Sequence, residues 1–352
     1  SAFRFIPVSG EFEQEMIAGE IAALEQLLGT VEGEDRMARK RIEKLKEGFE
    51  AKLEALGTVK DDLVTLGEIG VDQLIVDEAH EFRRLVFATN MGTLKGIDPE
   101  GSQRAWDLFV KTRFVETVNP GRALIMASGT PITNTMGELF TLQRFFAPDL
   151  LRERGIHTFD AWAANFGECR TELELQPSGL YKPVTRFSEF VNVPELIDVF
   201  RHFADVMLKG ELRQHLRLPR IAGGERRIIT TEPTRAFKAY QRVLDQRIRA
   251  IEARQGRPRK GDDILLSVIT DGRHAAIDLR LAVPGFAGEP ESKLPQSKLD
   301  VMIDNIEAIY RRTAETVYSA ADGVPYVLPG SVQLVFSDLG TPNVEAKRGF
   351  SA

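Results

Sequence analysis

Two short polar clusters carry the residue types in this chain that could do chemistry. Asp77-Glu78-Ala79-His80 follows an apolar run at residues 74–76, and Ser128-Gly129-Thr130 follows another at residues 123–127. An apolar run that stops abruptly at a polar cluster is typical of a buried parallel strand that delivers functional side chains at its carboxyl end. The sequence therefore predicts two such strands whose polar ends share one site.

The acidic cluster has the composition needed to cleave a phosphate bond. Mg²⁺ prefers oxygen ligands and retains water, so Asp77 could hold this ion through water. Glu78 could orient or deprotonate the attacking water. His80 is placed to sense the state of a nucleotide and to contact the second cluster. The structural alternative is that both acids cap a helix beginning at Ala79, since carboxylates stabilise helix N termini.

The second cluster combines small hydroxyl residues with a glycine. Ser128, Gly129 and Thr130 would allow the backbone to approach a phosphate or the acidic cluster closely. Taken alone, the segment could equally be a strand-to-helix turn with Ser or Thr as the cap. A plain turn explains one such segment better than it explains both in this order and at this spacing.

A metal site built from histidine and cysteine is not predicted. His80-Glu81 begins like the HExxH zinc-protease motif, but Arg84 stands at the position of the second histidine. The remaining histidines have no metal-ligand spacing with the single cysteine. They are His157, His202, His215 and His274, and the cysteine is Cys169.

The elements that must position the two clusters follow from periodicity. Strands are predicted at 72–77 and 122–127, with a helix at 101–117 between them, which is the βαβ unit of a parallel sheet. Another helix is expected at 135–147. Two helices at 11–30 and 35–56 carry apolar stripes at helical spacing and predict an antiparallel hairpin. Trp106 and Trp162 are expected in the core.

The second half of the chain shows a different pattern. Residues 151–290 are expected to be mainly helical, with a strand at 226–231 and a basic amphipathic helix at 234–254. A further helix is predicted at about 296–312. A final strand is predicted at 332–336, where Val-Gln-Leu-Val-Phe precedes Ser337-Asp338.

Composition bounds the class of protein. The 352 residues are 43% hydrophobic and 28% charged, as is ordinary for a globular protein, and the net charge is −6. No apolar run is long enough to predict a membrane span. The single cysteine excludes an internal disulfide and favours a reducing, cytoplasmic location.

Nucleic-acid binding is neither indicated nor excluded by an acidic chain, since a local basic track is enough. Arg213, Arg217 and Arg220 form such a track and could contact DNA phosphates. A solvated basic face is the structural alternative.

The residues after the second cluster identify a resemblance. Ser128-Gly129-Thr130-Pro131 continues through Glu138-Leu139 to Phe145-Phe146-Ala147-Pro148. Together with Asp77-Glu78-Ala79-His80, this resembles superfamily-two helicases of the Swi/Snf-like DNA translocase branch. It is similar in particular to bacterial and phage proteins in which such a helicase accompanies an adenine-specific DNA methyltransferase.

The resemblance implies an α/β fold: part of a RecA-like parallel sheet from the first helicase lobe, with large helical insertions and the start of a second lobe. The implied segments are an N-terminal strand and helical hairpin at 1–66, lobe one at 67–150, a mainly helical region at 151–290, and the entry to lobe two at 291–352.

The resemblance also implies a site for ATP and Mg²⁺. The partners that it implies are DNA and an adenine-specific DNA methyltransferase in the same or an adjacent protein, with no membrane. Asp77 would bind Mg²⁺ and Glu78 would position the water. His80, Ser128, Gly129 and Thr130 would couple the nucleotide state to lobe movement.

One part of that site is missing from the sequence. No Gly-Lys-Ser or Gly-Lys-Thr occurs, so the phosphate-binding loop of such motors is absent. We therefore expect a fragment of a DNA-dependent ATPase that binds no ATP tightly and is inactive alone. The alternative is a non-catalytic DNA-binding or scaffold module that retains the helicase fold. A third hypothesis is that the chain is an interaction protein that binds its partner through the N-terminal helical hairpin.

Overall fold

The structure, a computed structural model, divides the chain into two compact units. The first comprises residues 1–174 and 181–216, and the second comprises residues 175–180 and 217–352. The described residues are 3, 6–30, 36–58, 63–91, 94–133, 135–176, 181–208, 210–212, 221, 223–256, 258–259, 261–287, 297–320 and 322–340. No helix within these ranges is long and apolar enough to cross a membrane.

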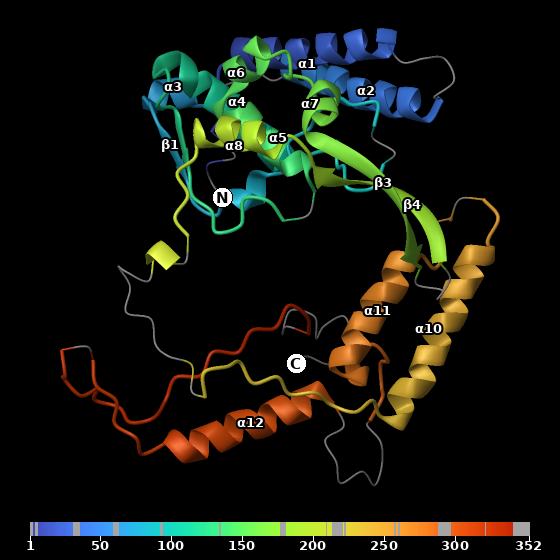
Figure 1. Ribbon diagram of the computed structural model, residues 1–352, viewed down its shortest axis with the longest axis vertical. Coiled ribbons are helices and arrows are strands. Elements are labelled where there is room, and N and C mark those ends of the chain that lie inside the picture. The colour runs from blue at the N-terminus through green and yellow to red at the C-terminus, as the bar shows by residue number, and fades with distance from the viewer. Residues whose placement is uncertain are drawn as a thin grey trace. The chain divides into compact units, whose positions relative to one another are not determined.

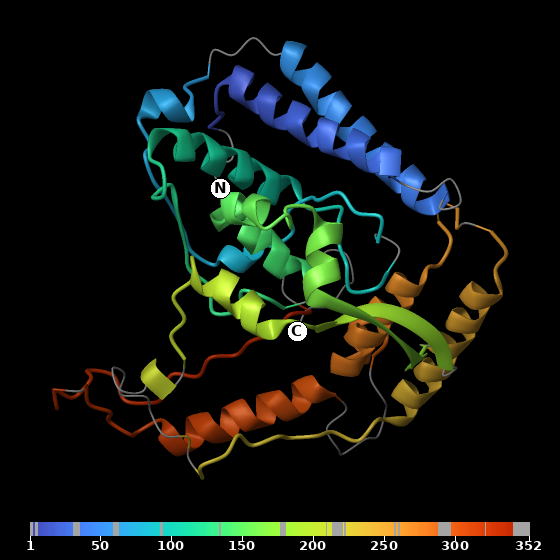
Figure 2. The same ribbon diagram turned by 45° about the horizontal axis from the view of Figure 1, so that its top comes forward.

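The predicted helical hairpin is present in the first unit. Helices α1 (Gly10–Thr30) and α2 (Arg36–Thr58) lie side by side (Figures 1 and 2). Their apolar stripes face inward, and Ile17 and Leu24 of α1 are buried together with Phe49 of α2. The hairpin is therefore part of the core of this unit.

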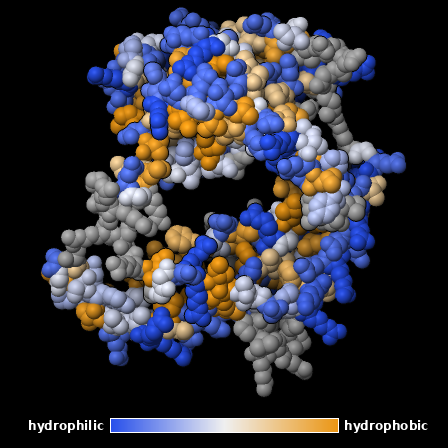
Figure 3. All heavy atoms as spheres, in the orientation of Figure 1, coloured by the Kyte–Doolittle hydropathy of each residue, from blue (hydrophilic) through white to orange (hydrophobic). Residues whose placement is uncertain are grey.

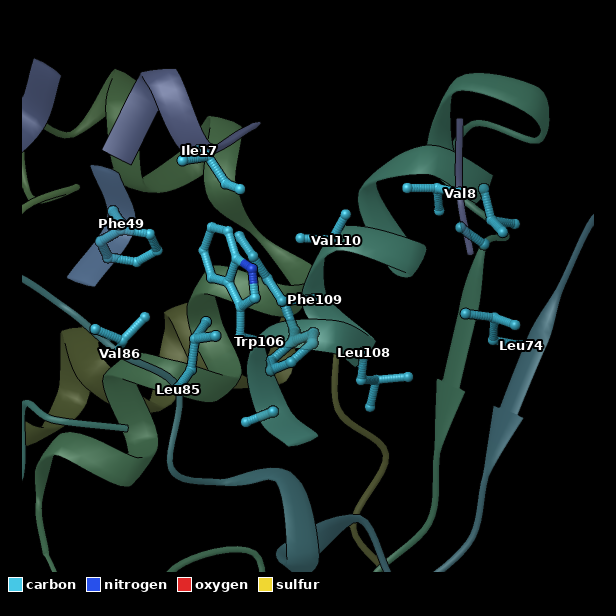
Figure 4. Close-up of a cluster of buried hydrophobic side chains, with 14 of the residues drawn as sticks. Val8, Ile17, Phe49, Leu74, Leu85, Val86, Trp106, Leu108, Phe109 and Val110 are labelled. Atoms are coloured by element: carbon cyan, nitrogen blue, oxygen red, sulfur yellow. The ribbon is translucent and has the colours of Figure 1, made fainter. Parts of the chain in front are cut away.

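Helix α4 (Gln103–Val118) confirms the helix predicted at 101–117, and it lies against the hairpin. Trp106 is buried, and its ring meets Phe49 edge to face with 5.0 Å between ring centroids. Figure 4 shows Trp106 beside Ile17 and Phe49 in this cluster. Such an aromatic pair contributes roughly 0.5–1.5 kcal/mol beyond the area it buries. The contact anchors the hairpin on the element that links the two strands.

Strands β1 (Leu74–Val76) and β2 (Leu124–Met126) form the predicted parallel pair, with Leu74 opposite Leu124 and Val76 opposite Met126. The described residues add no further strand to this sheet. Ile75 is 74% exposed and its partner Ile125 is 49% exposed, so one face of the sheet is bare. Parallel sheets are normally covered on both faces. This face is therefore an unusual feature of the unit.

The rest of the first unit packs around a second apolar cluster. Helix α5 (Gly137–Phe146) confirms the helix predicted at 135–147. Phe140, Phe159 and Trp162 are all buried there. The shorter helices are α3 (Leu66–Ile69), α6 (Pro148–Glu153), α7 (Phe159–Phe166) and α8 (Val193–Arg201).

An antiparallel hairpin interrupts the region that was predicted to be mainly helical. Strands β3 (Gly167–Leu175) and β4 (Tyr181–Phe190) pair with each other. Polar and apolar residues alternate at Glu172-Leu173-Glu174-Leu175, which is the period of a strand, and Pro-Ser-Gly follows at 177–179. The prediction of a mainly helical region gave more weight to the helical pattern on either side than to these strand signals.

The second unit is built from helices. Helix α10 (Arg235–Ala253) confirms the basic amphipathic helix, and α12 (Lys298–Thr313) confirms the helix expected at 296–312. Helix α11 (Leu265–Ile277) is followed by the short 3-10 helix η3 (Leu279–Leu281). Figure 3 shows hydrophobic residues at the surface of the molecule, and many in this unit are exposed, including Val327 and Phe336.

Two predicted strands are wrong. Residues 226–231 and 332–336 have no strand assignment. The predicted N-terminal strand stays a prediction, since most of residues 1–5 lie outside the described residues. A strand requires a neighbour to complete its hydrogen-bond ladder. The described residues provide no such neighbour, and Ile228 and Phe336 stay largely exposed. The second lobe's sheet is therefore not seen in the described structure, which is mixed α/β and mostly helical.

Candidate functional site

The parallel pairing brings the two polar clusters together. The Ala127 N–H donates to the carbonyl of Val76 over 2.9 Å, and the Ala79 N–H donates to the carbonyl of Ala127 over 2.9 Å. The ladder therefore continues one step beyond each strand and holds the backbones of both clusters in contact. This is the juxtaposition that the sequence predicts.

The acidic pair sits at a sharp change of backbone direction. Glu78 has φ 51° and ψ 46°, in the left-handed region that non-glycine residues rarely adopt. The Asp77 carboxylate accepts a hydrogen bond from the Glu78 N–H at 2.8 Å. The Glu78 side chain is 67% exposed. An unusual conformation at an exposed carboxylate motivates a functional hypothesis.

The helix-cap alternative finds little support at this point. A short 3-10 helix, η2 (Ala79–Phe82), does begin after Glu78. Glu78 occupies the cap position, but its side chain makes no capping hydrogen bond. The carboxylate of Glu78 instead lies 3.1 Å from Nδ1 of His80.

His80 connects the acidic cluster to the second cluster. Its Nδ1 lies 3.4 Å from the Ser128 hydroxyl as well as 3.1 Å from Glu78. Its Nε2 lies 3.8 Å from Glu81. The side chain is 26% exposed. His80 is thus the side chain through which the two clusters meet, and its role in coupling stays a prediction.

The Ser128-Gly129-Thr130 turn is closed by its own hydroxyl. The Ser128 Oγ accepts a hydrogen bond from the Thr130 N–H at 3.1 Å. A Cβ added to Gly129 would meet nothing within 4 Å. Packing within the described residues therefore does not require glycine here, and the open space would admit a bound group close to the backbone.

No role was predicted for Arg83 from the sequence, and neither was its pairing with Glu138. Arg83 Nε lies 3.0 Å from Glu138 Oε1, and the Glu138 side chain is only 4% exposed. Glu138 Oε2 accepts a hydrogen bond from the Thr133 N–H at 2.7 Å. The Glu138-Leu139 signature drew attention to this position but could not identify its partners.

The strand ends carry carboxylates, which are the kind of ligand that Mg²⁺ takes in proteins. Within the described ranges, no three His, Cys, Asp or Glu side chains gather into a metal-binding group. Mg²⁺ keeps several waters and takes one or two carboxylates together with phosphate oxygens. Asp77 would be the ligand that this chain offers to the ion, with water and phosphate oxygens as the remaining ligands.

The predicted DNA contacts cannot be placed. Arg213, Arg217 and Arg220 lie outside the described residues. On the neighbouring basic helix α10, Arg247 is already paired with Asp263 at 2.6 Å and Asp271 at 3.0 Å. A basic composition alone therefore overstates the charge that is free for phosphate contacts.

The strand pair and its polar ends define an α/β domain with a strand-end site. Residues 1–207 match a family model described as a probable helicase domain. Because this match covers more than half of the 352 residues, the chain belongs to that family. Every described residue of the strand-end site lies within the matched range.

The chain is also similar to Defense against restriction protein B of Escherichia phage P1, with 22% identity over 269 residues. The alignment covers 73% of this chain and 11% of the relative, so the chain spans about a tenth of the length of the curated relative it matches. No solved structure matches the chain. The Swi/Snf-like branch and the association with a methyltransferase stay predictions.

Proposed function

We propose that this chain carries the water-positioning part of an ATP site in a DNA-dependent motor of the Swi/Snf-like branch. The observation that supports this most strongly is the contact between the two strand ends, where Ala79 bonds to Ala127 and His80 lies 3.4 Å from Ser128. In this arrangement the acidic pair lies next to Ser128-Gly129-Thr130, the segment that would respond to the nucleotide state and to DNA.

Each residue has a role that its position allows. ATP with Mg²⁺, when bound, would supply the phosphate bond that is cleaved. Asp77 would hold the ion through water, and the exposed Glu78 carboxylate would orient the attacking water. His80 would pass a change at Glu78 to Ser128, because its Nδ1 is within 3.4 Å of both side chains.

The remainder of the ATP site must come from elsewhere. The sequence has no Gly-Lys-Ser or Gly-Lys-Thr. The face of the sheet that carries Ile75 and Ile125 is bare, which a parallel sheet normally is not. We infer that this face is covered by a further α/β segment that carries the phosphate-binding loop, within a longer parent protein.

Two partners belong to this proposal. DNA is the track of the motor, and an adenine-specific DNA methyltransferase is the associated enzyme implied by the motifs. The name of the phage P1 relative describes defence against restriction. We include in the proposal that the DNA motor of the parent protein acts against restriction.

ATP hydrolysis in the presence of duplex DNA tests the proposal. The 352-residue chain alone should hydrolyse no ATP above background, whereas the parent protein should do so in a DNA-dependent manner. Robust hydrolysis by the chain alone would contradict the proposal that a further segment supplies the rest of the ATP site. DNA binding by the parent without any hydrolysis would favour the alternative, a scaffold module that retains the helicase fold.

A further inference from the structure

A buried carboxylate joins the segments that follow the two strands. Glu138 is the second residue of α5, and its side chain is 4% exposed. Oε1 faces Arg83 Nε at 3.0 Å. Oε2 accepts from the Thr133 N–H at 2.7 Å, and the Thr133 hydroxyl lies 3.4 Å away. One carboxylate oxygen therefore accepts a hydrogen bond from the segment after the acidic cluster, and the other accepts one from the segment after Ser128-Gly129-Thr130.

Arg83 extends this connection back to the acidic cluster. Its Nη1 donates to the carbonyl oxygen of His80 at 2.8 Å, while its Nε is occupied by Glu138. His80 in turn reaches Ser128 through its ring. The contacts thus form a closed ring that runs from His80 through Arg83, Glu138 and the Thr133 loop back to Ser128.

We propose that Glu138 is a positioning residue, and that with Arg83 it forms a clasp that makes the two loops move as one body. The clasp comprises Arg83, Glu138 and the Thr133 N–H. A hydrogen bond to a charged group stabilises more than a neutral one, and a buried charge that loses its partner is strongly disfavoured. The two loops are therefore held together at a second point, beyond the strand ladder.

The consequence for a motor rests on the proposed function. If the acidic pair positions water for ATP hydrolysis, the clasp keeps that pair in register with Ser128-Gly129-Thr130 and transmits displacement of either loop to the other. The clasp itself is independent of ATP, because all of its members belong to this chain. A test without nucleotide therefore separates a failure of the clasp from a failure of the proposed function.

The test is backbone hydrogen exchange of the full chain, compared between wild type and Glu138→Gln. The glutamine keeps the shape of the side chain but has one acceptor oxygen in place of two. It can therefore accept a hydrogen bond from only one of the two loops. We expect exchange in residues 78–84 and in residues 128–133 to accelerate together by about tenfold or more, since a charge-assisted bond is lost. Exchange in α4 should not change.

A matched control is Glu68→Gln. The Glu68 carboxylate also accepts from a backbone N–H and a hydroxyl, both of Thr65, but it lies at the start of α3. This variant should leave both segments unchanged. A second test variant, Arg83→Lys, keeps the charge but lacks the fork that reaches both Glu138 and the His80 carbonyl. It should accelerate the same two segments.

Two results would overturn the proposal. One is acceleration in only one of the two segments, which would mean that the loops are not joined through Glu138. The other is acceleration throughout the first unit, α4 included, in both variants, which would make Glu138 an ordinary part of the core rather than a positioning residue.

Discussion

At the scale of single residues, the site depends on the left-handed backbone conformation of Glu78. Glu78 adopts φ 51°, and the acidic cluster turns there from strand β1 into η2. The types of the site residues and their strand-end positions were predictable, because apolar runs that end in polar clusters identify parallel strands. The roles of Arg83 and Glu138 were not predictable, because a hydrogen bond between residues 55 positions apart depends on how helix α5 packs.

The conformation of Glu78 predicts the order of stability of two variants. Glu78→Ala and Glu78→Gly both remove the carboxylate, but only glycine adopts positive φ without strain. Glu78→Gly should therefore be more stable than Glu78→Ala by about 1 kcal/mol. Urea unfolding followed by tryptophan fluorescence measures this, since both tryptophans, Trp106 and Trp162, lie in the first unit.

Equal stability of the two variants, or a more stable alanine variant, would show that residue 78 is not held in the left-handed region.

At the scale of elements, the helices were predicted better than the strands. Periodicity identified α1, α2 and α10, because an amphipathic helix satisfies its own backbone and needs only one apolar face covered. A strand also needs a partner, which a local pattern cannot supply. This is why β1 and β2 were found as a pair, while the apolar segment at 332–336 was wrongly predicted to be a strand.

The bare face of the β1–β2 sheet predicts opposite outcomes for adjacent residues. Leu74 is 6% exposed, so Leu74→Thr should lower the free energy of unfolding by about 2–4 kcal/mol. Ile75 is 74% exposed, and Ile75→Thr should change it by less than about 0.5 kcal/mol. Urea unfolding with tryptophan fluorescence checks both. Similar costs at the two positions would mean that the face of Ile75 is covered in this chain.

The junction between η3 and α12 predicts a dependence on pH. Burial of the Asp278 carboxyl favours its neutral form, but hydrogen bonds from the Arg280 side chain and the Ser297 hydroxyl outweigh this effect, so the pKa of Asp278 lies below the ordinary value for an aspartic acid. A lowered pKa means that the carboxylate stabilises the folded state above that value and loses this effect as the pH falls below it.

Asp278→Asn should therefore be less stable than wild type at about pH 5, and the difference should shrink towards about pH 3. Pepsin cleavage within residues 265–313 measures this when both chains are compared at each pH. A difference that stays constant, or grows as the pH falls, would contradict the assigned sign.

At the scale of the whole molecule, the chain has a strand-end site but lacks the phosphate-binding loop that would bind a nucleotide. Membership of a family of probable helicase domains is shown for residues 1–207. The phage P1 relative is far longer than this chain, which covers 11% of it. The four-segment division predicted from the sequence stays a prediction. If the proposed function is right, Glu78 positions the attacking water in the parent protein, where the site is complete.

The most direct test is DNA-stimulated ATP hydrolysis by the parent protein with Glu78→Gln, measured beside Glu68→Gln as the control. We expect Glu78→Gln to lower the rate constant of hydrolysis by about 100-fold or more, because general-base catalysis typically contributes that much. DNA binding should be unchanged, and Glu68→Gln should keep the wild-type rate. A Glu78→Gln protein that hydrolyses ATP at the wild-type rate would contradict the claim that this acidic pair positions the attacking water.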